Sequence, residues 1–381
     1  MSWNEAFLKD LADIQLGKML DEKKNQGEYR PYLGNDNVQW GFVDTSQIKE
    51  MKFKSSELER FSLRHGDILV CEGGDPGRCA LWLSDTPMCY QKALHRVRVY
   101  DRLDSRYLFH YLTYLGFTQE IRQYYTGGAT IKHLPKAALS RVVIRYPEIS
   151  IQKRIASILS AYDELIENNR KEIKLLEEAA QRLYKEWFID FKFPSHETTP
   201  IDPETNLPEG WKRGTIGDRF SINTGKRDAN YGTSDGHYPF FTCAQEPIKA
   251  PGYSFETEAI ILAGNGDLYS RLFRGKFEAY QRTYVIEPFD SEYLFLGAHC
   301  IDASMRVLKN RAAGSTIKYL TKGMIESIDF VIPTLKIQEQ FTCFCESVQS
   351  KVEKLQKQVA HLQEARDRLL PKLMSGEIEV N

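Results

Sequence analysis

The sequence lacks the long apolar runs that mark membrane and secreted proteins. No stretch of its 381 residues reaches the roughly 18 consecutive apolar residues of a membrane span. The opening residues, MSWNEAFLKD, contain no basic segment followed by an apolar one. Apolar residues make up 42% of the chain and charged residues 27%, as in ordinary globular proteins. We therefore expect a cytoplasmic protein with no membrane partner.

Cysteine is sparse and unpatterned. The seven cysteines are scattered, and no CxxC pair occurs. Cys343 and Cys345 have the spacing of half a metal site, but no second pair or HxxxH segment stands near them. Reduced thiols buried on a helix are the favoured interpretation, and no metal site is expected.

Motifs of catalysis are missing as well. The chain has no GxxxxGK[ST] loop and no HExxH helix. The glycine-rich segments at 73–78 and 263–271 lack the lysine-serine ending of a phosphate loop, which favours hairpin turns. ExK triplets at 50–52 and 172–174 have a nuclease-like spacing, but such triplets arise by chance in so charged a chain. We expect a non-catalytic protein.

What the sequence does contain is a tandem duplication. TIKHL at 130–134 returns as TIKYL at 316–320, and the same offset aligns PEISIQ at 147–152 with PTLKIQ at 333–338. Two long copies predict two units that each bury a core, unlike the short units of a solenoid. Shorter repeated pieces are Gly17-Lys18 with Gly225-Lys226 and Tyr90-Gln91 with Tyr280-Gln281.

Each copy runs from an aromatic-rich globular region, which we call a head, to a long helix. Strand-like runs such as GDILVCEGG and TYVIEP accompany helical stretches and turn signals, which predicts an α+β fold. A segment rich in proline and polar residues separates the copies. The expected parts are heads at 1–147 and 211–333, helices at 148–192 and 334–381, and a linker at 193–210.

The two helices carry a heptad pattern of apolar residues. A helix of some 39 residues spans about 58 Å, more than a domain of this size can cover, so it needs another long helix as partner. We expect an antiparallel coiled coil with pseudo-two-fold symmetry. Asn169 is the polar residue of the first seam and either fixes the register or lies exposed at a kink. The expected seam consists of Ile155, Leu159, Tyr162, Ile166, Asn169, Ile173, Leu176 and Leu183 with Val348, Val352, Leu355, Val359, Leu362 and Leu369.

The repeated residues belong to types that bind. Lysine and arginine neutralise phosphates, and glutamine and arginine pair with base edges. Residues 51–146 hold 15 lysines and arginines against 9 aspartates and glutamates, whereas residues 148–188 hold 7 against 8. Positive charge is therefore concentrated in the first head rather than in its helix, which indicates nucleic-acid binding by the head.

The chain resembles the specificity subunits of type I restriction-modification systems. The resemblance rests on the duplication, the two TIKxL segments, the Pro-x-x-x-Ile-Gln openings of the helices, LPEGW at 207–211 and EWFIDF at 186–191. Two features depart from the family pattern. No Leu-Pro-x-Gly segment precedes Trp3, and Pro371 lies in the last turns of the second helix, where we expect the helix to end or kink.

The resemblance implies two target-recognition domains, each reading one half of a bipartite, asymmetric DNA target, with the helices setting the spacer. It also implies three kinds of partner: double-stranded DNA, two methyltransferase (modification) subunits and restriction or translocase subunits. No cofactor is expected in this chain, and S-adenosylmethionine is expected in the modification subunits. The alternatives are a two-headed coiled-coil scaffold for protein partners and a self-contained modification enzyme, against which the missing cofactor motifs argue.

The resemblance also suggests which residues contact DNA. For each, the alternative is a solvated charge, and the two threonines either contact DNA or cap a turn. The candidates are Lys18, Arg78, Gln91, Lys92, Thr130 and Lys132 in the first head and Lys226, Arg227, Arg271, Arg274, Gln281, Arg282, Thr316 and Lys318 in the second.

Replacing Lys132 or Lys318 with alanine is expected to weaken DNA binding about equally for all sequences and to flatten its salt dependence, because a phosphate contact is lost. Binding isotherms over a range of salt concentrations measure both quantities. An unchanged affinity and salt slope would remove that lysine from the contact set.

Overall fold

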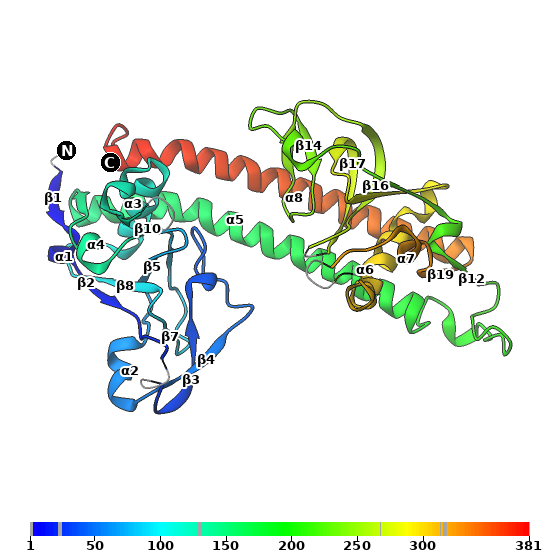
Figure 1. The fold of residues 1–381 in the computed structure, drawn as a ribbon, viewed down its shortest axis with the longest axis horizontal. Helices are drawn as coiled ribbons and strands as arrows, with labels where there is room; N and C mark the ends of the chain where they lie inside the picture. The colour runs from blue at the N-terminus through cyan, green and yellow to red at the C-terminus, as the bar shows by residue number, and fades with distance from the viewer. Residues whose placement is uncertain are drawn as a thin grey trace. The chain divides into compact units, whose positions relative to one another are not determined.

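The computed structural model describes residues 3–21, 25–128, 132–266, 268–312, 314 and 318–380. The chain forms two compact units, one of residues 1–169 with 357–381 and one of residues 170–356. The long helices α5 (Ile149–Tyr184) and α8 (Leu335–Ser375) each contribute to both units. Each unit therefore contains one head and a segment of both long helices (Figure 1).

The two larger sheets of the first head are separate from each other. A four-stranded sheet has the order β2-β8-β5-β6, and a three-stranded sheet has the order β4-β3-β7. The helix α3 (Ser105–Phe117) packs with the four-stranded sheet in one apolar core. The strands are β2 (Ala12–Leu16), β3 (Glu28–Leu33), β4 (Lys49–Phe53), β5 (Ile68–Cys71), β6 (Cys79–Leu81), β7 (Cys89–Tyr90) and β8 (Leu94–Val99).

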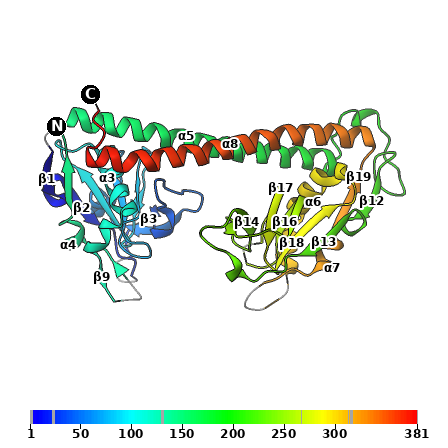
Figure 2. The ribbon, with the colours of Figure 1, turned by 90° about the horizontal axis from the view of Figure 1, so that it is seen from above.

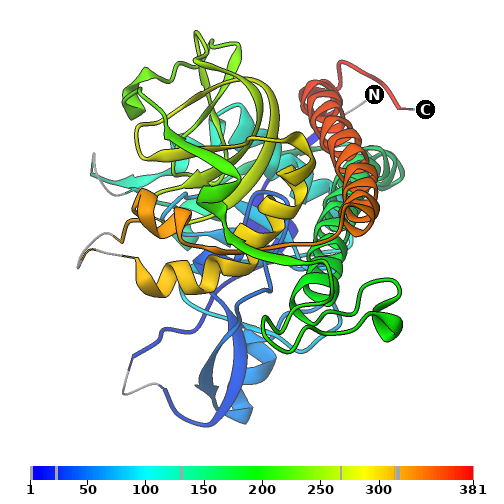
Figure 3. The same ribbon diagram turned by 90° about the vertical axis from the view of Figure 1, so that its right-hand side faces the viewer.

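In the second head the corresponding strands form one six-stranded sheet, in the order β13-β18-β16-β17-β14-β15. Its long strand β17 pairs antiparallel with β16 and parallel with β14. In the first head two separate strands make the corresponding pairings: β6 pairs antiparallel with β5, and β7 pairs parallel with β3. The helix α6 (Leu294–Arg311) shares a core with the sheet and the long helices (Figure 3). The strands are β13 (Phe220–Thr224), β14 (Tyr238–Phe241), β15 (Ile248–Ala250), β16 (Phe255–Ala263), β17 (Ser270–Ala279) and β18 (Thr283–Pro288).

Both heads close in the same way, by pairing their first strand with their last. In the first head β1 (Asn4–Phe7) pairs antiparallel with β11 (Val143–Tyr146), and in the second β12 (Lys212–Thr215) pairs with β19 (Asp329–Ile332). The last strand leads directly into the long helix, so each head begins beside the start of its own helix. The expected α+β duplication is confirmed.

In the first unit, α5 and α8 run in opposite directions. Ile155 and Leu159 share a core with Leu370 and Leu373. One turn further along α5, Asp163 forms an ion pair of 2.7 Å with Arg366. Still further along, Asn169 Nδ2 donates to Gln358 Oε1 at 3.4 Å. The residue numbers of the contacts increase along α5 while those of their partners decrease along α8, so the pairing is antiparallel (Figure 2).

Asn169 lies within the unbroken helix α5 and is half-buried, so it faces the partner helix rather than an exposed kink. In the second unit the antiparallel order continues. Glu172 pairs with Lys351 at 3.3 Å, and Phe188 packs edge-on against Phe341. The expected seam residues are all buried or half-buried. Helix α8 passes through Pro371 and ends four residues later, at Ser375.

The repeated glutamine of Pro-x-x-x-Ile-Gln anchors the first helix to its head. Gln152 is 1% exposed, and its amide oxygen accepts from the backbone N–H of Asp104 at 2.8 Å. Its amide nitrogen donates to the carbonyls of Arg102 and Pro147. Gln338 is equally buried, but its amide has no hydrogen-bond partner in the part of the chain that the structure describes. Among the described residues, the glutamine of the motif therefore ties the helix to its head by hydrogen bonds in the first copy alone.

A buried histidine joins the first head to α5. His110 of α3 lies 3.1 Å from Ser160 Oγ and 3.9 Å from the carboxylate of Asp163. Burial lowers the pKa of His110 to about 3, and the positive charges of Arg366 and Arg106 act in the same direction. Its ring is therefore neutral at physiological pH.

Replacing Leu159 with alanine is expected to lower the free energy of unfolding by about 2 to 5 kcal/mol, because a fully buried leucine of the seam leaves a cavity. Leu165, 50% exposed on the same helix, is the matched control, and its replacement is expected to change stability by less than about 0.5 kcal/mol. Denaturant unfolding measures both. Equal effects of the two substitutions would contradict the seam.

The stability of the protein is expected to fall with acid partly through His110. Between the unfolded pKa of about 6.5 and the folded value of about 3, the unfolded chain binds the proton and the folded chain does not, so stability decreases as the pH drops. His110→Gln should make the loss shallower by up to about 1.4 kcal/mol per pH unit in this window. His361→Gln, on the exposed face of α8, is the control. An unaltered slope in His110→Gln would refute this role.

Candidate nucleic-acid interface

The repeated motifs of the first head meet at one place, which we call the repeat junction. It joins the segment after β2, the end of β3, the residue after β5, the turn before β8 and the end of TIKHL. Backbone hydrogen bonds hold these five segments together, so their relative positions do not depend on side chains. The bonds run from Gly17 N to Leu94 O (3.0 Å), Lys92 N to Lys18 O (2.8 Å), Gln91 N to Leu33 O (3.0 Å), Leu94 N to Gln91 O (3.0 Å), Glu72 N to Ala93 O (2.9 Å) and Leu134 N to Glu72 O (2.7 Å).

The second head repeats all six of these bonds. They connect the segments after β13, β14 and β16, the turn before β18 and the end of TIKYL. The duplication therefore preserves a backbone framework as well as a fold. The bonds run from Gly225 N to Thr283 O (3.1 Å), Gln281 N to Arg227 O (2.9 Å), Tyr280 N to Phe241 O (2.9 Å), Thr283 N to Tyr280 O (2.8 Å), Gly264 N to Arg282 O (2.9 Å) and Leu320 N to Gly264 O (2.8 Å).

This framework corrects the alignment of the two copies by one residue. The repeated Tyr-Gln pair suggested that Gln91 matches Gln281, but Gln91 makes the bonds that Tyr280 makes. Lys92 accordingly matches Gln281, and Lys18 matches Arg227 rather than Lys226. The backbone hydrogen bonds define which residues of the two heads correspond, and the shared Tyr-Gln dipeptide does not change this correspondence.

The repeated glycine of this framework has a steric cause. A Cβ atom on Gly17 would lie 2.3 Å from the carbonyl oxygen of Gln91, and one on Gly225 would lie 1.9 Å from that of Ala279. Real Cβ atoms do not approach so closely, so only glycine lets the two backbones touch. The glycine of the Gly-Lys repeat is structural, and its neighbours carry the variable side chains.

Several of the expected contact residues of the first head surround the junction with unengaged side chains. Gln91, Lys92 and Lys132 have no side-chain hydrogen bond or ion pair within the described ranges. Lys132 is exposed, and the other two are half-buried. Arg78 is half-buried and donates to the carbonyl of Asn35 at 3.0 Å. Lysines and glutamines without internal partners are free to bind an external anion or base.

In the second head, Lys226 and Arg282 are exposed, and neither side chain has a partner among the residues described. Gln281 Nε2 donates to Asp228 at 2.8 Å. Arg227 lies 3.5 Å from the carboxylate of Glu278 and stacks on a tyrosine ring. These groups give the second junction a polar and cationic edge.

Lys18 and Arg274, both expected to contact DNA, form short ion pairs with carboxylates of the same chain. Lys18 is 3% exposed, its ammonium lies 2.6 Å from Glu57, and it donates to the carbonyl of Lys52. Arg274 makes two hydrogen bonds, of 2.6 and 2.7 Å, to Glu346 of α8, and this contact raises the pKa of Arg274. Both cations are therefore paired with carboxylates of the same chain, and their contact with DNA stays a prediction.

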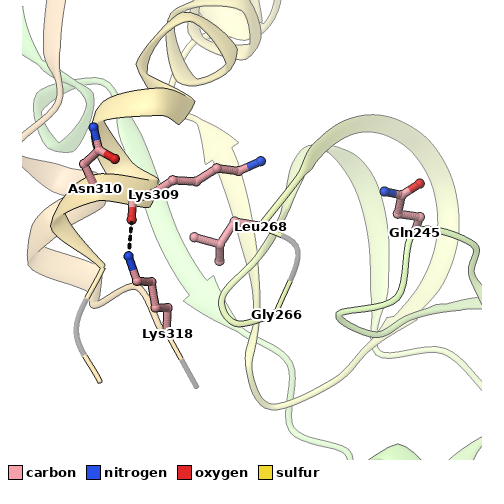
Figure 4. A pocket seen from close by; sticks show the side chains of 6 residues that line it. All are labelled: Gln245, Gly266, Leu268, Lys309, Asn310 and Lys318. Atoms are coloured by element: carbon pink, nitrogen blue, oxygen red, sulfur yellow. Dashed lines mark hydrogen bonds between the residues drawn. The ribbon is translucent and has the colours of Figure 1, made fainter. Parts of the chain in front are cut away.

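Sequence reasoning missed part of a pocket of about 460 Å³ in the second head (Figure 4). Lys309 and Asn310 line it from the end of α6, opposite Gln245, and Lys318 Nζ lies 3.5 Å from the carbonyl of Lys309. Arg271, among the expected residues, donates to the carbonyl of Gln245 at 3.0 Å. The basic end of α6 was the available signal, but it reads equally well as an ordinary helix terminus.

The expected contacts Thr130 and Thr316 lie outside the described residues. Among the residues that are described, no cluster of histidine, cysteine, aspartate or glutamate is arranged to hold a metal ion. Cys345 is buried, whereas Cys343 is exposed, contrary to the expectation that both are buried. No described helix is long and apolar enough to cross a bilayer.

Comparison with known proteins matches this chain to one family. A family model described as the type I restriction modification DNA specificity domain matches residues 1–178 and 208–362. The specificity subunit of the type I restriction enzyme MjaIX from Methanocaldococcus jannaschii is 26% identical over 420 aligned residues, which cover 99% of this chain and 94% of that protein. The specificity subunit of the EcoDI enzyme from Escherichia coli is 36% identical over 178 residues, 45% of this chain and 39% of that one.

A solved structure shares the fold. The S subunit of a type I restriction-modification system from M. genitalium superposes with a TM-score of 0.59 over 98% of this chain and 96% of that chain, at 18% identity. The family model covers most of the sequence in two segments, one for each copy of the duplication. The chain therefore belongs to the DNA specificity subunits of type I restriction-modification systems.

Proposed function

We propose that each head reads one half of a bipartite, asymmetric DNA target. The observation that carries this proposal is the duplicated repeat junction, in which one backbone framework presents different side chains in the two heads. Free donors at its edge, such as Lys132 and Arg282, suit phosphates and base edges. Because the side chains differ between the heads, the two half-sites differ.

The paired helices set the spacer between the half-sites and dock two modification subunits, with restriction subunits joining the assembly. Supporting this part are the length of α5 and α8, their contribution to both units and the largely apolar seam between them. A paired helix resists bending, so it fixes a separation as dimer geometry fixes half-site spacing. The chain itself does no chemistry in this proposal, and S-adenosylmethionine belongs to the modification subunits.

A protein-binding scaffold is the rival function. It would use the same helices but would give no reason for the free lysines and arginine at both junctions. DNA selectivity of the assembled complex separates the two proposals.

The test assembles this chain with its modification subunits, incubates the complex with a random-sequence DNA pool and maps the methylated positions. One bipartite sequence with a fixed spacer is expected. A variant with one heptad inserted after Asn169 and one after Gln356, keeping the seam, should prefer a spacer longer by about three base pairs, because seven residues add about 10 Å.

The matched control carries the heptad in α5 alone, which breaks the register of the seam and should reduce stability rather than lengthen the spacer. Methylation without sequence preference would defeat the proposed function. An unchanged spacer in the double insertion, with the protein folded, would defeat the role of the helices.

A further inference from the structure

The repeat junction of the second head borders a recess of about 380 Å³. Three of the five junction segments contribute to its wall, namely the residue after β16, the turn before β18 and the end of TIKYL, and the last residue of β13 completes it. Its seven lining residues are Thr224, Gly264, Gln281, Arg282, Tyr284, Tyr319 and Leu320.

The shared framework identifies the residue of the first head that matches each lining residue. For example, Thr224 pairs with Tyr284 across β13 and β18, as Leu16 pairs with His95 across β2 and β8. Of the seven positions, only the leucine of TIKxL is the same in both heads. The differing pairs are Thr224 with Leu16, Gly264 with Glu72, Gln281 with Lys92, Arg282 with Ala93, Tyr284 with His95 and Tyr319 with His133.

Tyr284 and His95 occupy matching positions and make the same contact in the two heads. The hydroxyl of Tyr284 donates to the carbonyl of Leu320 at 2.9 Å, and His95 Nε2 lies 2.8 Å from the carbonyl of Leu134. Both side chains hold the TIKxL segment in place. Since they are occupied by this contact, they are not the groups that read a ligand.

Arg282 is the lining residue best placed to meet a ligand. Its side chain is exposed, with no hydrogen bond or ion pair to any residue that the structure describes. Its backbone is fixed, because its carbonyl accepts from the N–H of Gly264 at 2.9 Å. Gln281 is oriented beside it by the bond to Asp228 and retains a free amide oxygen. The result is a planar guanidinium on a rigid base next to an acceptor.

We propose that Arg282 determines specificity in the second head by binding the edge of a guanine base of its half-site. A guanidinium makes two parallel hydrogen bonds to O6 and N7 of guanine, which distinguishes guanine from the other bases. The matching residue of the first head is Ala93, which cannot make such a contact, so this reading is confined to one half of the target. This inference rests on the proposed function and assigns one element of it to a residue.

The experiment uses the chain with its modification subunits and measures affinity for the DNA sequence that the wild-type complex methylates. A panel of duplexes carries every single base-pair change in both half-sites. Arg282→Ala is expected to lose roughly ten- to hundredfold of discrimination at one guanine position of one half-site, and none in the other half-site. Arg282→Lys keeps the charge but not the two parallel donors, so it should retain affinity for unrelated DNA without restoring discrimination.

Lys212→Ala is the matched control, because Lys212 is an exposed cation of the same head on β12, in a different sheet from the recess. It should leave discrimination unchanged. A uniform loss of affinity in Arg282→Ala, with a flatter salt dependence, would mark a phosphate contact and overturn the inference. Unaltered discrimination would overturn it as well. A wild-type complex without sequence preference would defeat the proposed function itself.

Discussion

The apolar stripe along α5 and α8 is the constraint on which the rest of this structure depends. Each stripe runs along a helix of 36 or 41 residues, and over that length it is removed from water only by another long helix. The duplication supplies that helix within the same chain. Because the pairing is antiparallel, each unit contains the same kinds of segment: one head, the first turns of one long helix and the last turns of the other.

The heads solve a different physical problem, which is to hold variable side chains on an invariant support. Six backbone hydrogen bonds recur in both junctions, and backbone bonds do not depend on which side chains the segments carry. At the junctions, a Cβ atom would collide with a backbone carbonyl oxygen at Gly17, Gly225 and Gly264, so these three positions require glycine. The side chains at most matching positions of the two junctions differ.

Much of this architecture was predictable from the sequence, because periodicity and internal repetition are local signals. The strand TYVIEP has the same bounds in the structure as in the pattern, and the seam residues are buried or half-buried as expected. The candidate site was harder to predict. Lys18 and Arg274 look like surface cations, but each is neutralised by a carboxylate 39 or 72 positions away in sequence, which no single-sequence pattern reveals. The one-residue shift between the two copies likewise becomes visible only in the backbone pairing.

The pairing of first and last strands has a mechanical consequence. At the point where a head passes into its long helix, a four-residue ladder such as β1 with β11 lies in parallel with the covalent chain. Tension or torque applied to a head is thus shared between two strands instead of falling on one peptide linkage. A torque applied to a head therefore passes into its helix through two strands, and the strand ladder stiffens the connection between head and helix.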